Sequence, residues 1–255
     1  MSFLPQRQHL HRQLRGLFGL AASIAMLFIP PALHAQDSEL QPFQASYVWY
    51  WHGAEVALSR VSLTHQSDDL WSYDSSTRPR GIGVLHPERP DLHSLMRITD
   101  GHVTPLQFKA TGSGRQHDAN VSFDWDQKRA TGLYQGMKLD LPLSAGVQDD
   151  LSVQIAMLAQ LRAGKTPEPV MEIDKSSVRE YDYTRESDVA LDTALGRIDT
   201  TVYALHHPGS PRTTRFWCAP SLGYIPLQVQ QRRDYADGSQ GVEWTMKIRS
   251  LGHAP

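Results

Sequence analysis

The chain lacks most of the features that mark catalytic, metal-binding or nucleic-acid-binding proteins. It has 1 cysteine in 255 residues, which excludes an internal disulfide and any zinc site built on two thiolates. The formal net charge of −2 excludes the strong basic field that holds phosphate backbones, so we expect no nucleic-acid partner. The 40% of hydrophobic residues is enough for a packed core and excludes a disordered chain.

The first 35 residues are typical of a secretory signal peptide. An arginine-containing start is followed by an apolar run over residues 16–29, by Pro30-Pro31 and by the small-residue site Leu33-His34-Ala35. A membrane anchor, the alternative, needs roughly 20 apolar residues, and this run is shorter. A lipoprotein signal needs a cysteine at the cleavage site, and Cys218 is far away. We therefore expect cleavage after Ala35, a periplasmic protein and no integral membrane segment after cleavage.

Residues 36–255 read as a single β-rich domain. Residues 43–51 alternate between apolar and polar side chains, and residues 56–63 continue this pattern after the turn at His52-Gly53. Asp100-Gly101 is typical of a tight hairpin turn. About ten strands are predicted, with connections too short for the crossover helices that parallel pairs need. The sequence thus predicts a mainly β fold, an antiparallel meander that forms a strongly curved sheet or a partly open barrel.

One segment has helical periodicity. Its apolar residues recur at helical spacing from Leu151 to Leu161, Asp149 and Asp150 can cap its start, and Gly164 followed by Pro167 ends it. We expect one amphipathic helix of about four turns, which covers part of the concave face of the sheet or plugs one end. The proline- and glycine-rich segment over residues 77–91 predicts a long surface loop instead of a strand.

No pattern of catalytic or metal-binding residues is present. The chain has no Gly-x-Ser-x-Gly motif, and the adjacent His206 and His207 would point to opposite faces of a strand. Cys218 follows Trp217 in an apolar strand, which favours a buried structural cysteine over a reactive thiol. Helix capping accounts for the paired aspartates. We expect no enzyme activity, no catalytic residue, no metal and no cofactor.

Aromatic and cationic residues are the remaining candidates for binding. Aromatic side chains in strands are more often core residues, and loop arginines are more often solvated, but an incompletely filled barrel of this kind can hold a ligand. In that case the aromatic residues would line the pocket and the arginines would meet a polar head group at its mouth. The candidate ligand-binding residues are Tyr47, Trp49, Trp51, Arg78, Arg80, Arg89, Trp125 and Trp217.

Several short segments, in order, resemble an exported Gram-negative family catalogued as domain of unknown function 3108. They include Ser94-Leu95-Met96-Arg97, Asp149-Asp150-Leu151-Ser152 and, most specifically, the run from Trp217 to Pro226. The resemblance extends over residues 40–251 and implies a periplasmic β-rich domain without an assigned activity. The segment around Gly223, Tyr224 and Pro226 is also similar to one in periplasmic lipoprotein-carrier and sigma-regulator folds, which suggests a lipid ligand.

Two functions follow as hypotheses. The first is a non-enzymatic periplasmic protein that binds a lipid-like or acyl-chain ligand, or another envelope component, in the concavity of the curved sheet. The second is a structural or regulatory module that pairs with an envelope protein partner through an exposed strand edge.

Overall fold

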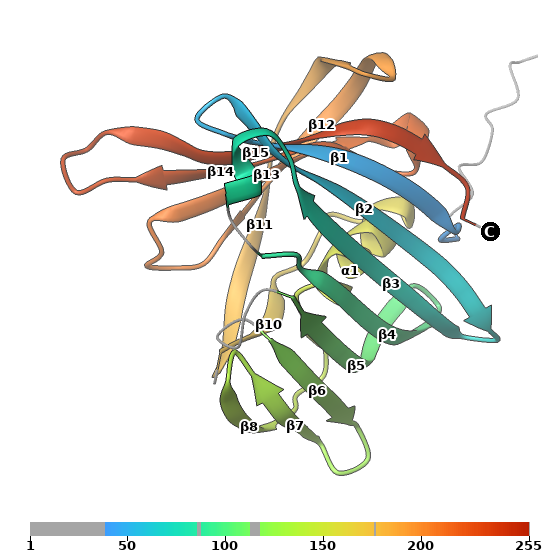
Figure 1. The fold of residues 1–255 in the computed structure, drawn as a ribbon. Coiled ribbons are helices and arrows are strands. Elements are labelled where there is room, and N and C mark those ends of the chain that lie inside the picture. The colour runs from blue at the N-terminus through green and yellow to red at the C-terminus, as the bar shows by residue number, and fades with distance from the viewer. Residues whose placement is uncertain (1–38, 86–87, 113–117, 176, 255) are drawn as a thin grey trace, which may run out of the picture. The chain divides into compact units, whose positions relative to one another are not determined.

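The strands follow one another in the sheet almost in the order in which they occur in the chain (Figure 1). The computed structural model describes residues 39–85, 88–112, 118–175 and 177–254, and the expected signal peptide lies outside them. All described residues belong to one compact unit.

The first half of the sheet consists of eight strands. They are β1 (Phe43–Trp51), β2 (Ala54–Ser67), β3 (Leu70–Pro79), β4 (Asp91–Thr99), β5 (His102–Thr111), β6 (Ala119–Asp124), β7 (Arg129–Tyr134) and β8 (Met137–Pro142).

The second half contains the shortest and the longest strands. They are β9 (Val147–Gln148), β10 (Val170–Asp174), β11 (Ser177–Thr193), β12 (Gly196–His206), β13 (Arg212–Ala219), β14 (Ile225–Asp234) and β15 (Gln240–Gly252). One α-helix, α1 (Ser152–Arg162), and two 3-10 turns, η1 (Gly81–Leu85) and η2 (Pro220–Leu222), complete the described elements.

Pairing between the first and last strands joins the two halves of the sheet. The strand order is β8-β7-β6-β5-β4-β3-β2-β1-β15-β14-β13-β12-β11-β10-β9, so that β1 lies beside β15. Gln44 is opposite Gly252 and Tyr50 is opposite Thr245 in this antiparallel pair. The first strand and the last strand are therefore neighbours in the middle of the sheet. The beginning of β1 lies next to the end of β15.

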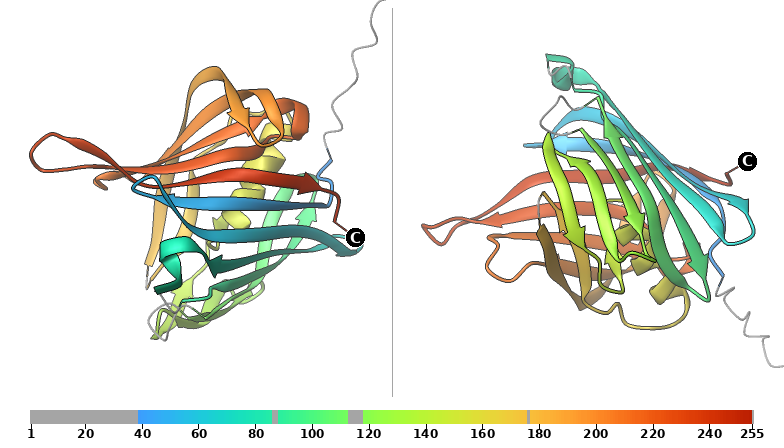
Figure 2. Two further views of the ribbon diagram at one scale, coloured as in Figure 1. Left: turned by 45° about the horizontal axis from the view of Figure 1, so that its top comes forward. Right: turned by 90° about the horizontal axis from the view of Figure 1, so that it is seen from below.

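Helix α1 lies on the inner face of the curled sheet (Figures 1 and 2). Ile155 and Leu158 of the helix are buried against Phe43 of β1, Leu63 of β2 and Leu227 of β14 in the main hydrophobic core. A second cluster places Met157 and Leu161 against Phe216 and Cys218. The alternation read from the sequence thus separates an inner apolar face, covered by α1, from an outer face.

The strand pattern is confirmed in its main part and wrong in two details. The mainly β fold, the curvature and the hairpins at His52-Gly53 and Asp100-Gly101 are as expected. The described sheet has 15 strands, not about ten. β9 and β10 pair in parallel, which corrects the fully antiparallel prediction, because α1 itself supplies the crossover between them.

The start and length of the helix also differ from expectation. α1 has 11 residues, about three turns. The Asp149 carboxylate accepts hydrogen bonds from the amides of Leu151 and Ser152, at 2.9 and 2.8 Å, and therefore caps the first turn. Asp150 instead accepts a hydrogen bond of 2.6 Å from the Tyr134 hydroxyl, so capping accounts for only one of the two aspartates.

The proline- and glycine-rich segment is shorter as a loop than expected. β3 continues to Pro79, η1 follows, and β4 already begins at Asp91. Within the described part of the chain, no helix is long and apolar enough to cross a membrane.

Candidate ligand-binding site

An apolar cavity of about 390 Å³ lies where the two ends of the β-rich chain meet the last turn of α1. We call it the end cavity. Its walls are residues 40–43 before and in β1, Leu158 and Arg162 of α1, residues 222, 223 and 225 around η2, and residues 251–253 at the end of β15. The volume is at the low end of the range for small-molecule sites, about 300–1,000 Å³. Seven of the twelve lining residues are leucine, isoleucine, phenylalanine or proline, whose side chains offer an apolar surface to an apolar chain.

The turn after η2 forms one wall of the end cavity. Gly223 and Tyr224 both have left-handed backbone conformations, with φ of 66° and 64°. The amide of Tyr224 donates to the Ala219 carbonyl at 2.8 Å, which closes the turn. The Arg162 guanidinium packs directly on Gly223, and a Cβ there would overlap it. The glycine thus allows the cation to lie against the turn at the cavity wall.

The end cavity was not predicted from the sequence, although part of its wall lies in a segment that stood out there. Leu222, Gly223 and Ile225 belong to the run that carried the family resemblance. Only the pairing of β1 with β15 brings residues 40–43 to residues 251–253, and the sequence gives no local signal for that pairing.

The central concavity of the sheet is filled. Tyr47 is buried, and its hydroxyl donates to the Pro226 carbonyl at 3.0 Å. Between Tyr47, Tyr73 and the helix residues Met157 and Leu158 only about 30 Å³ of space is left. The pocket expected at Tyr47 is therefore occupied by α1.

Trp49 lies on the same face of β1 as Tyr47, two residues further along the strand. Its ring lies 4.9 Å from that of Trp244, centroid to centroid, and its Nε1 donates to Ser59 at 2.6 Å. Trp244 Nε1 in turn donates to Gln231 at 3.1 Å. Trp51, at the end of β1, is 52% exposed and contacts only His52 among the described rings.

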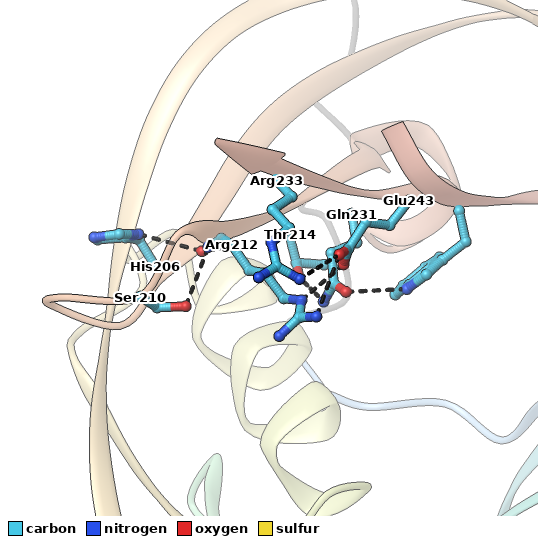
Figure 3. Close-up of polar contacts among 8 residues, drawn as sticks. His206, Ser210, Arg212, Thr214, Gln231, Arg233 and Glu243 are labelled. Atoms are coloured by element: carbon cyan, nitrogen blue, oxygen red, sulfur yellow. Dashed lines mark hydrogen bonds and ion pairs between the residues drawn. The ribbon is translucent and has the colours of Figure 1, made fainter. Parts of the chain in front are cut away.

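Polar side chains of β13, β14 and β15 form a network next to Trp244 (Figure 3). Glu243 accepts from Arg212 Nε at 2.7 Å and from Arg233 Nη1 at 3.5 Å. Gln231 Nε2 donates to Thr214 at 3.3 Å. The hydrogen bond from the Arg212 guanidinium lowers the pKa of the Glu243 carboxyl. This network joins β13, β14 and β15, with two guanidinium groups on one carboxylate.

The other two tryptophans of the candidate set lie elsewhere. Trp125 Nε1 donates to the Pro105 carbonyl at 2.7 Å, and its ring stacks on Phe123. Trp217 alternates with the buried Phe216 and Cys218 and so projects from the opposite face of β13. The structure does not bring these two rings to Trp49 or to each other.

The loop arginines are engaged in local contacts. Arg78 forms an ion pair of 2.8 Å with Asp91, and Arg80 one of 3.3 Å with Glu55. The Arg89 amide donates to the Gly112 carbonyl at 2.6 Å. Arg78 and Arg80 are about half exposed, and such exposed pairs contribute little to stability.

A larger groove of about 740 Å³ crosses the outer face of β15, β1, β2, β3 and β4. Ser46, Arg60 and Ser62 form part of its floor and alternate with the buried Ala45, Val61 and Leu63. Most residues that line this groove are polar or charged, whereas most that line the end cavity are apolar, so the smaller end cavity is the better candidate for a lipid chain.

We next consider the residues of the described segments that could bind a metal ion or take part in catalysis. No group of three or more histidine, cysteine, aspartate or glutamate residues there has a metal-binding arrangement. Cys218 is buried as expected, and burial raises the pKa of its thiol. The burial of Asp150 raises the pKa of its carboxyl to about 7, and Glu172 nearby has a pKa raised by burial and by the charge of Asp150.

The expected exposed strand edge is present at β8. This strand ends the sheet, and Met137 of β8 and Leu133 of the neighbouring β7 are 44% and 54% exposed. Its use by a partner protein stays a prediction.

Comparison with solved structures supports the fold. A β-barrel-like protein of domain of unknown function DUF1849 from Brucella abortus aligns over 85% of this chain and 99% of its own, with a TM-score of 0.54 and 12% identity. A putative lipoprotein from Parabacteroides distasonis aligns over 84% and 96%, with a TM-score of 0.33 and 9% identity. MucB of the Pseudomonas aeruginosa MucA/MucB complex aligns over 87% and 96%, with a TM-score of 0.19 and 10% identity. At these identities only the first likeness informs on the fold.

Comparison by sequence gives the family. No curated protein matches the chain. The profile of the family described as protein of unknown function (DUF3108) matches residues 46–245, which include most of the sheet, α1 and the turn at Gly223. The chain therefore belongs to the DUF3108 family.

Proposed function

We propose that this protein is a non-enzymatic periplasmic protein that binds a lipid-like ligand with a single apolar chain in the end cavity. The observation that carries the proposal is the apolar cavity of about 390 Å³ between α1, η2 and the paired ends of β1 and β15. The cavity replaces the central concavity as the expected location of the ligand, because α1 fills the latter.

The lining of the end cavity favours an acyl chain over a polar small molecule. Leu158, Leu222 and Leu251 face the space from three different elements, so a flexible chain would contact apolar surface on several sides. Burial of such a chain is favourable by roughly 25 cal/mol per Å² of apolar surface. The volume suits one chain and is small for a lipid with several chains.

The cellular location and the absence of catalysis are part of the same proposal. The signal-like segment over residues 1–35 supports export to the periplasm. The buried Cys218 thiol and the ion-paired surface arginines offer no activated nucleophile. A carrier or sensor for a lipid-like ligand needs neither.

The test is calorimetric titration of the mature protein with laurate in detergent-free buffer. Laurate should bind with one site per chain. Leu222→Trp, which places a large ring at the cavity wall, should weaken binding about tenfold or more, because it occupies the space of the chain.

Val242→Trp provides the matched control. Val242 is 40% exposed on β15 and does not line the cavity, so the same bulk there should leave the affinity unchanged. Thermal unfolding of both variants checks that they fold. Absence of laurate binding by the wild-type protein, or equal weakening by both variants, would refute the proposal.

A further inference from the structure

The groove on the outer face of the sheet, which we call the outer groove, is elongated and lies on the face opposite α1 (Figure 2). It has a volume of about 740 Å³, and its lining residues come from β15, β1, β2, β3 and β4. These strands are consecutive in the sheet, so they span about 19 Å, or four spacings of about 4.8 Å. The outer groove is therefore long enough for an extended ligand of several units.

The strand register aligns polar residues in rows across the outer groove. Ser46 of β1 is opposite Ser250 of β15 on one side and Arg60 of β2 on the other. Arg60 is opposite Ser76 of β3, which is opposite Asp91 of β4. The neighbouring row consists of Gly252, Gln44, Ser62, Asp74 and His93. Neither row contains an apolar side chain, so a ligand that lies along them meets hydroxyl, amide and charged groups.

A β-bulge brings a second arginine to the outer groove. Ser46 is opposite Ser250. The next residue of β1, Tyr47, is opposite Ile248, so that Arg249 is an extra residue of β15. Arg249 and Ser250 are both exposed, whereas Ile248 is buried. Regular alternation would place residues 249 and 250 on opposite faces, and the bulge instead presents both at the outer groove.

The carboxylates that line the outer groove have basic partners, whereas its arginines have no acidic ones. Asp74 lies 2.7 Å from His93 Nδ1, and Asp91 forms an ion pair of 2.8 Å with an arginine of β3. Arg60 and Arg249 are exposed, and within the described segments their side chains make no ion pair and no hydrogen bond. An anion in the outer groove would therefore meet two guanidinium groups that no carboxylate of the protein neutralises directly.

We propose that the outer groove binds an anionic oligosaccharide, with carboxylates of its sugar units at Arg60 and Arg249. A guanidinium matches the two oxygens of a carboxylate, and serine hydroxyls both donate and accept hydrogen bonds, as sugar hydroxyls do. An acidic peptide fits less well, because extended peptides are recognised through pockets for their side chains, and the rows of polar residues form none. The inference goes beyond the proposed function, since it concerns the face of the sheet opposite α1.

The experiment is an NMR titration of the mature protein with three tetramers: tetragalacturonate, maltotetraose and tetraglutamate. Tetragalacturonate has both carboxylates and sugar hydroxyls, so it should bind and shift the amide signals of Ser46, Arg60 and Ser250. Maltotetraose lacks the charge and tetraglutamate lacks the hydroxyls, so each should bind at least about tenfold more weakly. Equal affinity for tetragalacturonate and tetraglutamate would overturn the assignment to a saccharide, and equal affinity for the two saccharides would overturn the role of the arginines.

Charge-removing variants test the two arginines. Arg60→Gln and Arg249→Gln should each weaken the binding of tetragalacturonate about tenfold and leave that of maltotetraose unchanged. Lys138→Gln is the matched control, because it removes the same charge from an exposed residue of β8 that does not line the outer groove. It should leave both affinities unchanged. Thermal unfolding checks that each variant keeps the fold.

The outcomes separate this inference from the proposed function. Absence of tetragalacturonate binding by the wild-type protein, or equal weakening by Arg60→Gln and Lys138→Gln, would refute the saccharide site. Neither result affects the end cavity, because Arg60, Arg249 and Lys138 do not line it. Laurate should therefore bind all three variants as it binds the wild-type protein.

Discussion

Arg162 and Gly223 are packed so closely that a methyl group at residue 223 would overlap the guanidinium of Arg162. This contact joins the last turn of α1 to the turn between β13 and β14, and it forms a wall of the end cavity. It also gives a physical reason for a glycine in the run from Trp217 to Pro226, the most specific part of the family resemblance.

Gly223→Ala should destabilise the protein by more than about 2 kcal/mol, as measured by urea unfolding. The left-handed conformation at φ 66° accounts for about 1–2 kcal/mol, and displacement of Arg162 adds to it. Gly53→Ala is the control, because Gly53 has φ 80° and no atom near its Cβ position. In the Arg162→Ala background, the cost of Gly223→Ala should fall to that of Gly53→Ala. An unchanged cost there would mean that the two residues do not interact.

The Trp49–Trp244 contact should be structural. Trp49→Ala removes a ring contact and the hydrogen bond to Ser59, so we expect a loss of roughly 2–3 kcal/mol in the free energy of unfolding. Trp51→Ala, at a half-exposed ring, should change it by no more than about 0.5 kcal/mol. Laurate affinity, measured by calorimetry, should be unchanged in both. Weaker binding by the folded Trp49→Ala protein would return the ligand to the concave face.

The buried acids should make the protein less stable as the pH rises. Burial raises the folded-state pKa of Asp150 to about 7, whereas the unfolded chain releases this proton near the ordinary pKa of aspartate, about 4. Between these values the folded state holds a proton that the unfolded state has lost, so stability falls from about pH 4 to about pH 7 and then levels off.

Asp150→Asn should flatten this profile. The amide oxygen still accepts the hydrogen bond from Tyr134, and no charge is then placed beside Glu172. At pH 8 we expect the variant to be more stable than the wild type by roughly 2–4 kcal/mol. Asp126→Asn, at an exposed turn, serves as the control. The free energy of unfolding of the wild-type protein is measured by urea unfolding between pH 5 and pH 8. A rise over this range would contradict the raised pKa of Asp150.

Cys218 should report on unfolding. The thiol is buried, and its raised pKa keeps it protonated at neutral pH, so iodoacetamide should label the chain only as fast as it opens. Labelling followed by mass spectrometry should track the urea transition. Rapid, complete labelling of the native protein would show that the site is accessible. Cys218→Ser should cost about 1–3 kcal/mol, since a buried hydroxyl lacks a partner there.

The sequence was sufficient to predict those parts of the fold that depend on local patterns. Alternation gave the hairpins around His52-Gly53 and Asp100-Gly101, and helical spacing gave α1. The parallel pair of β9 and β10 was missed because β9 has only two residues, too few for any periodicity. Asp150 looked like a cap, because its bond to Tyr134 depends on β7 lying beside the start of α1.

The sequence predicted an apolar ligand pocket, but it did not predict the residues that line the end cavity. Aromatic and arginine residues are prominent in the sequence, but the structure places them under α1, in ring stacks or in ion pairs. The end cavity is lined mainly by apolar residues with no distinctive sequence pattern. Its walls include residues 40–43 and 251–253, which come together only because β1 pairs with β15.

The most direct test is a crystal structure of the protein with laurate that carries bromine on its terminal carbon. The anomalous signal of the bromine should lie inside the end cavity, among Leu158, Leu222 and Leu251. A bromine signal against Trp49 or in the outer groove at Arg60, with the end cavity empty, would contradict the account.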